Sequence, residues 1–277
     1  MTTRVAAIQL QAAADKADGI ARATALVERA AAAGAQLVVL PEKWTGVGGA
    51  ERLRAVAEPL REGPAYAAMQ GWARELGIAV VGGSITELRD DGTLANASIA
   101  FDAGGREAGV YRKIHMFDVE AGGRVYRESA AEQAGEEVVA CDLAGWRTGL
   151  TICYDLRFPE LFRALVDDGA RLLTVPACFT VATGRDHWEV LLRARAIENQ
   201  CWVIAAGQWG EPGGMPSYGR SMVIDPWGLV LAQAPDEDGF ALAELDADRQ
   251  DDIRRRLPAL AHRRPAVYAR AAQRADG

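Results

Sequence analysis

The 277-residue sequence lacks the features of several large classes of protein. No apolar run approaches the roughly 18 residues that a membrane-spanning helix needs, and a strand pattern begins at Arg4, which leaves no room for a signal peptide. Lys and Arg number 31 against 38 Asp and Glu, so the formal net charge is −7. We therefore expect a cytoplasmic protein that binds neither nucleic acid nor a membrane.

Cysteine and histidine are scarce, and their spacing fits neither a metal centre nor a disulfide framework. No two of the four cysteines form a Cys-x-x-Cys pair, and the three histidines are far apart. The sequence also has no G-x-S-x-G, G-x-G-x-x-G or P-loop motif. We expect free thiols in a reducing compartment and no metal or organic cofactor. The cysteines are Cys141, Cys153, Cys178 and Cys201, and the histidines are His115, His187 and His262.

What the sequence does contain is an alternation of short apolar segments with amphipathic helices. The apolar segments predict strands that are buried on both faces, and hairpin-like segments among them predict mixed sheets. Two such sheets with helices outside them would bury these strands, so we expect an α/β fold. No linker divides the chain, which predicts one domain over 1–277 with a core of about residues 4–245. Helices are expected over 16–33, 64–76, 186–200 and 246–257, and from Pro159 onwards.

Residues 149–162 have the pattern of a strand, a sharp turn and a helix. The apolar run ends at Cys153, and Pro159 stands in the first turn of a helix with an apolar stripe. This geometry presents a side chain at the carboxyl edge of a sheet beside backbone N–H groups, where a thiol can attack a carbonyl carbon. A buried core cysteine would give the same local pattern. A dyad with His115 or His187 is also conceivable, although nothing local selects either.

Two charged residues also stand at strand ends. Glu42 follows Pro41 after a buried strand, where open α/β sheets place their ligands, and a carboxylate there suits a general base. Lys113 shares a strand face with Tyr111 and could point inward, where its ammonium would need Glu42 or a substrate oxyanion as a partner. Each residue could instead be a solvated side chain at the start of a loop.

The segment 117–137 is polar and irregular, and a loop of this length in a compact domain is usually functional. It contains Glu128, about which spacing alone says nothing. Arg195 falls on the apolar stripe of the expected 186–200 helix, together with Trp188 and Leu192. We expect its guanidinium to be buried and paired with a carboxylate, so that it either braces the fold or orients a group in the site.

Three segments together resemble the Glu–Lys–Cys signatures of the nitrilase, or carbon–nitrogen hydrolase, superfamily. They are Pro41-Glu42, Tyr111-Arg112-Lys113-Ile114-His115 and Ile152-Cys153-Tyr154-Asp155-Leu156-Arg157-Phe158-Pro159-Glu160. The resemblance extends from Val5 to Tyr268 and implies a four-layer α-β-β-α sandwich with two mixed sheets. It also implies a homodimer or higher homo-oligomer that forms through the outer helices, with residues 246–277 in the contact.

The resemblance also implies a role for each matched residue. Cys153 would be the nucleophile and Glu42 the general base, while Lys113 and the backbone N–H of Tyr154 would hold the oxyanion. Glu128 matches the second glutamate of the superfamily, which would position Lys113 and the substrate. These roles imply hydrolysis through a cysteine thioester without a cofactor.

Segments within 183–201 and 219–228 are similar to the amidase branch that includes deaminated-glutathione amidase and ω-amidase. This similarity implies cleavage of a primary amide of a small carboxylate-bearing substrate to an acid and ammonia. Amides of the α-ketoglutaramate type are the next candidates, followed by N-carbamoyl compounds and nitriles, and an inactive binding module is the alternative from another class. Lys43-Trp44-Thr45 and Arg185-Asp186 depart from those amidases. Candidates for substrate binding are Arg157, Phe179, Thr183, Arg185, His187 and Arg195.

Overall fold

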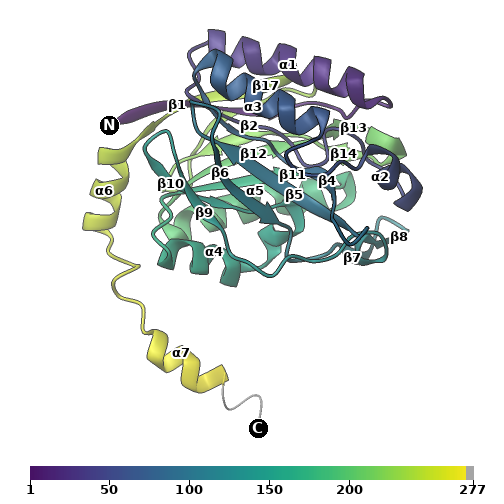
Figure 1. Cartoon of the computed structure of the whole chain (residues 1–277). Helices are drawn as coiled ribbons and strands as arrows, with labels where there is room; N and C mark the ends of the chain where they lie inside the picture. The colour runs from purple at the N-terminus through teal and green to yellow at the C-terminus, as the bar shows by residue number, and fades with distance from the viewer. Residues whose placement is uncertain (273–277) are drawn as a thin grey trace.

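The computed structural model describes residues 1–272, and its centre is a pair of mixed β-sheets packed face to face (Figure 1). The first sheet consists of β1 (Thr2–Gln9), β2 (Leu37–Val39), β3 (Ala79–Val81), β4 (Ile85–Leu88), β5 (Leu94–Phe101), β6 (Glu107–Arg112) and β17 (Gly239–Asp246). Its order is β17-β1-β2-β3-β5-β4, with β6 paired to β5. β1, β2 and β3 run parallel, whereas β17 and β5 join them antiparallel, as the hairpin-like segments predicted.

The second sheet has six strands and the same mixed character. It consists of β9 (Ala140–Leu143), β10 (Trp146–Leu150), β11 (Leu172–Ala177), β12 (Trp202–Gly207), β15 (Met222–Ile224) and β16 (Val230–Gln233). The order is β16-β15-β12-β11-β10-β9, and the central strands β10, β11 and β12 are parallel. The carboxyl ends of these three strands therefore meet at one edge of the sheet.

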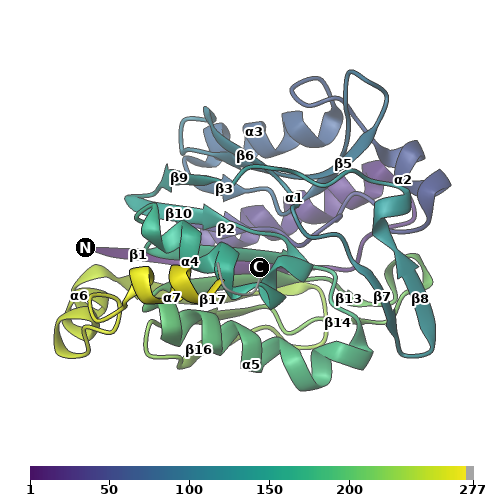
Figure 2. The same cartoon turned by 90° about the horizontal axis from the view of Figure 1, so that it is seen from below.

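Helices cover the outer face of each sheet, which gives four layers (Figure 2). α1 (Lys16–Ala32) and α3 (Pro64–Leu76) lie on the first sheet, and α4 (Pro159–Asp167) and α5 (Val181–Asn199) lie on the second. β1 shows why residues 5–8 are apolar without alternation: Val5 and Ala7 face the second sheet, whereas Ala6 and Ile8 face the helices. The α-β-β-α sandwich expected from the sequence is confirmed.

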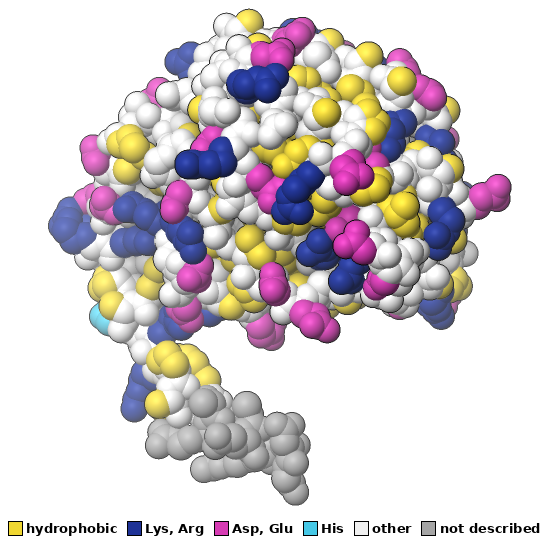
Figure 3. Space-filling model, in the orientation of Figure 1, with side chains coloured by type: hydrophobic (Ala, Val, Ile, Leu, Met, Phe, Trp, Pro, Cys, Tyr) yellow, Lys and Arg dark blue, Asp and Glu magenta, His cyan; other side chains and the backbone are white. Residues whose placement is uncertain are grey.

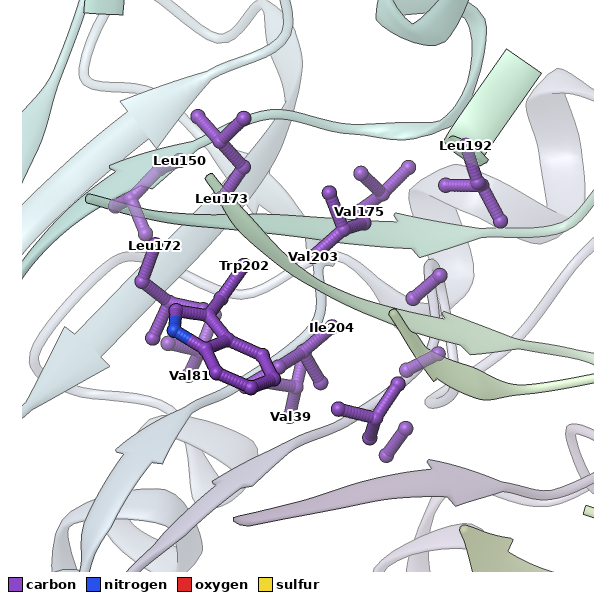
Figure 4. Packing of buried hydrophobic residues seen from close by; sticks show 14 of the residues in the cluster. Val39, Val81, Leu150, Leu172, Leu173, Val175, Leu192, Trp202, Val203 and Ile204 are labelled. Carbon is purple, nitrogen blue, oxygen red and sulfur yellow. The ribbon is translucent and has the colours of Figure 1, made fainter. Parts of the chain in front are cut away.

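The space between the sheets is filled by branched and aromatic side chains. Figure 4 shows Val39 and Val81 of the first sheet facing Trp202 and Ile204 of the second, and all four are almost completely buried. Burying a side chain of this size contributes about 1.5–3 kcal/mol. The central strands are therefore fixed rigidly, and so are the residues that follow their carboxyl ends.

The largest departure from expectation lies in the segment 117–137, whose first part is regular structure, while residues 131–137 contain no helix or strand. This first part forms the hairpin β7 (Asp118–Ala121) and β8 (Arg124–Arg127), followed by the 3₁₀ turn η1 (Glu128–Ala130). α2 (Ala50–Val56), η3 (Pro212–Gly214) and the short pair β13 (Trp209–Gly210) and β14 (Ser217–Tyr218) were not anticipated either. α5 begins at Val181, five residues before the expected start, because Thr180 rather than Arg185 precedes its first turn.

The C-terminal segment leaves the sandwich. α6 (Ala247–Arg256) directly follows β17, and its Gln250 is hydrogen-bonded to Arg171 before β11 (2.9 Å) and to the carbonyl of Gln200 before β12 (2.9 Å). α7 (Pro265–Ala272) projects away from the body (Figure 1). Arg263 is ion-paired with Asp167 of α4 just before this arm. The last part of the expected contact segment, residues 273–277, lies outside the described residues. Within the described part of the chain, no helix is both long enough and apolar enough to cross a membrane.

Candidate active site

The carboxyl ends of four strands open into one cavity of about 360 Å³. Glu42 comes shortly after β2, Lys113 directly after β6, and Cys153 shortly after β10, and Glu128 begins η1 directly after β8. All four residues line the cavity, although as many as 111 positions separate them in the sequence (Glu42 to Cys153). The structure thus brings together the four side chains that the sequence singled out one by one.

Cys153 occupies the sharp turn between β10 and α4, at the start of the 3₁₀ turn η2 (Cys153–Arg157). Its φ of +49° lies in the left-handed region, which is uncommon for a residue that carries a side chain, and its exposed fraction is 7%. The buried carboxylate of Asp155 fixes this turn by accepting from Ile152 N (2.8 Å) and from the Tyr111 hydroxyl (2.6 Å). Tyr111 belongs to β6, the strand that ends just before Lys113. Its bond to Asp155 therefore fixes the turn that carries the thiol relative to Lys113.

Neither histidine considered as a partner of Cys153 is available to it. His115 Nδ1 lies 2.7 Å from Asp155 Oδ1, and its ring stacks on Phe158 with centroids 3.6 Å apart. His187 is exposed and pairs with Arg157 instead. The carboxylate beside the thiol is that of Glu42, which lines the same cavity and whose charge helps to raise the pKa of Cys153.

The carboxylate of Glu42 is almost completely buried, and both of its oxygens are occupied. Oε1 accepts from Lys113 Nζ (3.1 Å) and from Asn96 Nδ2 (2.8 Å), and Oε2 accepts from the backbone N–H of Cys178 (2.8 Å). These bonds fix the orientation of the carboxylate beside the thiol. A group held in this way can accept and return a proton at one defined place.

Lys113 links Glu42 to Glu128. Its ammonium lies 2.7 Å from Glu128 Oε2 and 3.0 Å from Glu128 Oε1, and only 1% of the side chain is exposed. Burial alone would lower the pKa of Lys113, but the charges of Glu128 and Glu42 outweigh it and hold that pKa well above its usual value. The same pairing holds the pKa of Glu128 well below its usual range despite burial. Lys113 is therefore a permanent cation in the cavity.

The Cys153 thiol is protonated at rest. Burial raises its pKa well above the usual value, and the neighbouring carboxylate of Glu42 raises it further, against the smaller opposite effect of Lys113. The same two causes raise the pKa of Cys178 to about 12. A buried neutral thiol is a weak nucleophile, so the sulfur can attack only while Glu42 removes its proton.

Residues 4–255 match the family described as Carbon-nitrogen hydrolase. The chain belongs to this family. A deaminated glutathione amidase of Synechocystis sp. is 38% identical over 93% of this chain and 97% of its own length. The human omega-amidase NIT2 is 36% identical over 96% of both chains. The crystal structure of the C. elegans NitFhit protein superposes with a TM-score of 0.89 at 35% identity, over 96% of this chain and 66% of that longer one.

Lys43 also lies in the cavity of this carbon–nitrogen hydrolase. In the sequence it stood out only because similar amidases carry a different residue there. Lys43 directs its ammonium to Glu132 Oε2 (2.5 Å) and to Glu128 Oε1 (3.2 Å). The only signal in the sequence was its place directly after the expected base. Within the described residues, no group of three or more His, Cys, Asp or Glu side chains is arranged to hold a metal ion. In this cavity the carboxylates are paired with lysines.

The six residues expected to bind substrate divide into two groups. Phe179 and Thr183 line the cavity. The other four do not: Arg157 bonds His187, and Arg185 is exposed on α5. Arg195 is buried on α5 as expected, but it donates to the carbonyl of Leu156 (2.8 Å) and to Glu198 (2.8 Å), so it braces the fold. Of the two roles expected for Arg195, bracing the fold or orienting a group in the site, the structure shows the first.

The mouth of the cavity is formed by the unexpected hairpin. Arg124, Tyr126 and Arg127 of β8 line it, and Arg124 donates to the carbonyl of Gly214 in η3 (3.0 Å). Phe117 packs edge-on against Tyr154 with centroids 5.1 Å apart, which closes the wall beside the thiol. The sequence reasoning missed these arginines because the segment was read as an irregular loop. The cavity is thus apolar along its wall and cationic at its mouth.

Proposed function

We propose that this protein is a thiol amidase that hydrolyses a primary amide of a small carboxylate-bearing molecule. One observation carries the proposal: a thiol, a buried carboxylate and an ammonium bound to that carboxylate line the same small cavity. These are the nucleophile, the base and the oxyanion donor that acyl transfer requires. Membership of the carbon–nitrogen hydrolase family and the names of the similar amidases support the same assignment.

In the first half of the reaction, the Cys153 sulfur attacks the amide carbon as Glu42 takes the thiol proton. The C–S bond forms, and the negative charge on the former carbonyl oxygen is held by Lys113 and the backbone N–H of Tyr154. Glu42 then returns the proton to the nitrogen, the C–N bond breaks, and ammonia leaves. The product of this half is a thioester on Cys153.

In the second half, water attacks the thioester carbon while Glu42 takes one of its protons. The C–S bond breaks, the thiolate is reprotonated from Glu42, and the acid leaves. Glu128 holds Lys113 through both halves. One carboxylate can serve all four proton transfers because it stays beside the sulfur throughout.

The substrate class follows from the mouth of the cavity. Neither Arg124 nor Arg127 forms an ion pair with an acidic side chain of the described residues. Arg124 donates to the carbonyl of Gly214 and Arg127 to that of Tyr126, and each guanidinium keeps further N–H donors for a substrate anion. Guanidinium groups bind carboxylates well because their geometry allows two parallel hydrogen bonds. A deaminated-glutathione amidase-like substrate fits first, and an amide of the α-ketoglutaramate type second.

We further propose that the chain acts as one domain in a cytoplasmic homodimer. Trp227, Leu229 and Leu257 are each about half exposed (54%, 49% and 49%) and lie together beside α6. Such a group of large apolar side chains is typical of a surface that another protein covers. In the space-filling view, hydrophobic side chains also lie on the projecting α7 arm (Figure 3). These features favour the outer helices and residues 246–277 as the contact.

The test is ammonia release from a panel of purified compounds. Deaminated glutathione and α-ketoglutaramate should release ammonia, neutral amides of similar size should react much more slowly, and N-carbamoyl compounds and nitriles should be poor substrates. A Cys153→Ala variant should be inactive on all of them. Iodoacetamide should label Cys153 first in the wild type, because Cys141 and Cys201 do not line the cavity and the thiol of Cys178, which does, is paired with Ser217 Oγ (3.3 Å). If no amide released ammonia and all four thiols reacted equally slowly with iodoacetamide, the inactive binding module would be favoured instead.

A further inference from the structure

Lys43 is the second ammonium of the cavity, and its place in the chain is unusual. It directly follows Glu42, yet both side chains line the same cavity. In an extended strand two successive side chains point to opposite faces. Here the backbone of Lys43 has a φ of +50°, in the left-handed region, and that turn brings the two side chains together.

Several bonds maintain this strained backbone. The N–H of Lys43 donates to Ser84 Oγ (3.1 Å), and its carbonyl accepts from Gln208 Nε2 (3.1 Å). The side chain is held by Glu132, which is itself completely buried. Left-handed residues with side chains persist only where the surroundings fix them, and they are frequent at functional sites.

The resting contacts of Lys113 pose a problem for the proposed reaction. An ammonium has three N–H donors, and Lys113 directs them at three carboxylate oxygens: Glu42 Oε1, Glu128 Oε1 and Glu128 Oε2. To hold the oxyanion it must release one of them. If Lys113 released Glu42, the general base would lose its neighbouring cation. If it releases Glu128 Oε1 instead, Lys113 keeps its 2.7 Å contact to Glu128 Oε2.

Glu128 Oε1 is the oxygen that Lys43 also contacts, at 3.2 Å. Asn96 Nδ2 lies at the same distance, but it is neutral and cannot replace a charge. We propose that Lys43 is a positioning residue that retains Glu128 Oε1 while Lys113 turns from that oxygen to the oxyanion of the substrate. This inference rests on the proposed amidase function.

Glu132 keeps Lys43 in place. Its Oε2 lies 2.5 Å from the Lys43 ammonium. Without Glu132, the ammonium would be free to move fully onto Glu128 or Glu42 and to compete with Lys113. Glu42 and Glu128 line the cavity with the two ammonium groups, and Glu132 is buried outside its lining. Each ammonium contacts two of these three carboxylates.

A Lys43→Met variant tests the inference on the best amide of the panel. We expect kcat to fall by about tenfold or more, but by less than the roughly 10²–10³-fold that loss of a whole oxyanion donor costs, with KM little changed. The Lys43→Arg variant should keep much of the wild-type kcat, because its guanidinium retains the positive charge.

The pH profile gives a second readout. Glu128 faces Lys113, Lys43, Glu42 and Glu132, and Lys43 is one of the two cations that lower the pKa of Glu128. Its removal raises that pKa, so Glu128 becomes protonated, and Lys113 loses its anchor, at a higher pH than in the wild type. The acid limb of the kcat profile should therefore shift to higher pH in Lys43→Met.

Two further variants separate positioning from folding. In Lys43→Met/Glu132→Leu the whole ion pair becomes apolar, a change that is often neutral or stabilising, so stability should recover while the kcat defect remains. Lys16→Met breaks a similar pair with the buried Glu58 (2.6 Å), and neither residue lines the cavity, so only stability should fall. Recovery of wild-type kcat in the double variant, or an unchanged kcat in Lys43→Met, overturns the inference alone. A wild type that hydrolyses no amide overturns the proposed function as well.

Discussion

Lys113 lies between two carboxylates that would otherwise face each other in a buried cavity. In Lys113→Ala we expect kcat for amide hydrolysis to fall by about 10²–10³-fold or more, because an oxyanion donor is lost. The free energy of unfolding should also fall by about 3–5 kcal/mol, since two buried charges lose their partner. Steady-state ammonia release and thermal unfolding measure the two effects.

A matched variant separates these effects. Lys16→Met removes a cation from a buried glutamate outside the cavity and should lower the melting temperature without lowering kcat. Lys113→Ala protein that retains more than a tenth of the wild-type kcat would contradict the role given to this ammonium.

Single residues also show how far the sequence could predict the site. Glu42, Lys113 and Cys153 were candidates because each follows an apolar strand, and strand ends converge at one edge of a sheet. Their roles, and the inclusion of Glu128, came from the resemblance to the superfamily. Lys43 was not assigned a role, because its direction depends on one left-handed dihedral angle that no pattern of residue types reveals. Arg195 was expected to be buried, and it is, but its partner could not be known before α5 was placed on η2.

At the scale of elements, the turn between β3 and β4 supports the backbone around Glu42. Ser84 N donates to the carbonyl of Pro41 (3.1 Å), and Gly83 has a φ of +63°. A Cβ added at Gly83 would lie 1.9 Å from that carbonyl oxygen. We expect Gly83→Ala to reduce the free energy of unfolding by about 2–4 kcal/mol and to lower kcat, because the backbone of Glu42 must move.

The β4–β5 turn offers the control for this substitution. Gly92 has a similar positive φ, +79°, but nothing lies within 4 Å of an added Cβ. Gly92→Ala should cost only about 1 kcal/mol and leave kcat unchanged. Denaturant unfolding of the two variants should therefore separate backbone strain from steric displacement, and equal losses in both would refute the steric explanation.

The β7–β8 hairpin makes a prediction about specificity. Replacing Arg124, which spans from β8 to η3 at the cavity mouth, with Ala should raise KM for carboxylate-bearing amides by about tenfold, the equivalent of 1.4 kcal/mol. KM for a neutral amide of similar size should not change. Arg157→Ala and Arg185→Ala remove the arginines first expected to bind the acid. If either of these two variants raised KM for carboxylate-bearing amides more than Arg124→Ala does, the assignment of acid binding to β8 would be contradicted.

The elements that the sequence predicted well are those whose burial creates a pattern. β1, β2, β11 and β12 are apolar because both faces are covered, and α3 ends where it was expected. The β7–β8 hairpin was missed because its strands have four residues each and none of them is buried, so the alternation in β7 is too short to mark a strand and β8 has none. Exposed functional loops lack this signal in general, since packing does not constrain them.

At the scale of the whole molecule, charges of both signs are mixed over the surface, whereas the mouth of the cavity carries mainly positive ones. On the face in Figure 3, Lys and Arg are interspersed with Asp and Glu, and the net charge of the chain is −7. The cavity mouth differs locally, because Arg124 and Arg127 lie there without acidic partners among the described residues. Increasing salt should therefore raise KM for acidic amides and leave neutral ones unaffected.

The assembly can be tested through the apolar group beside α6. Light scattering after size exclusion should give a dimer for the wild type. Trp227→Asp/Leu229→Asp should give a monomer, because two charges would have to be buried in the contact. A wild type that is monomeric at micromolar concentration would contradict the proposed dimer. Glu62→Lys in an exposed loop is the control and should remain dimeric.

The formation of an acyl group on Cys153 tests the central claim most directly. Wild-type protein would be mixed with the amide that releases ammonia fastest, quenched in acid within one turnover, digested and measured by mass spectrometry. The peptide that contains Cys153 should carry the substrate mass minus ammonia, accompanied by about one equivalent of released ammonia per site, and Glu42→Gln should carry none. Ammonia release at the wild-type rate by Cys153→Ala, or an acyl group on any other cysteine, would contradict the account.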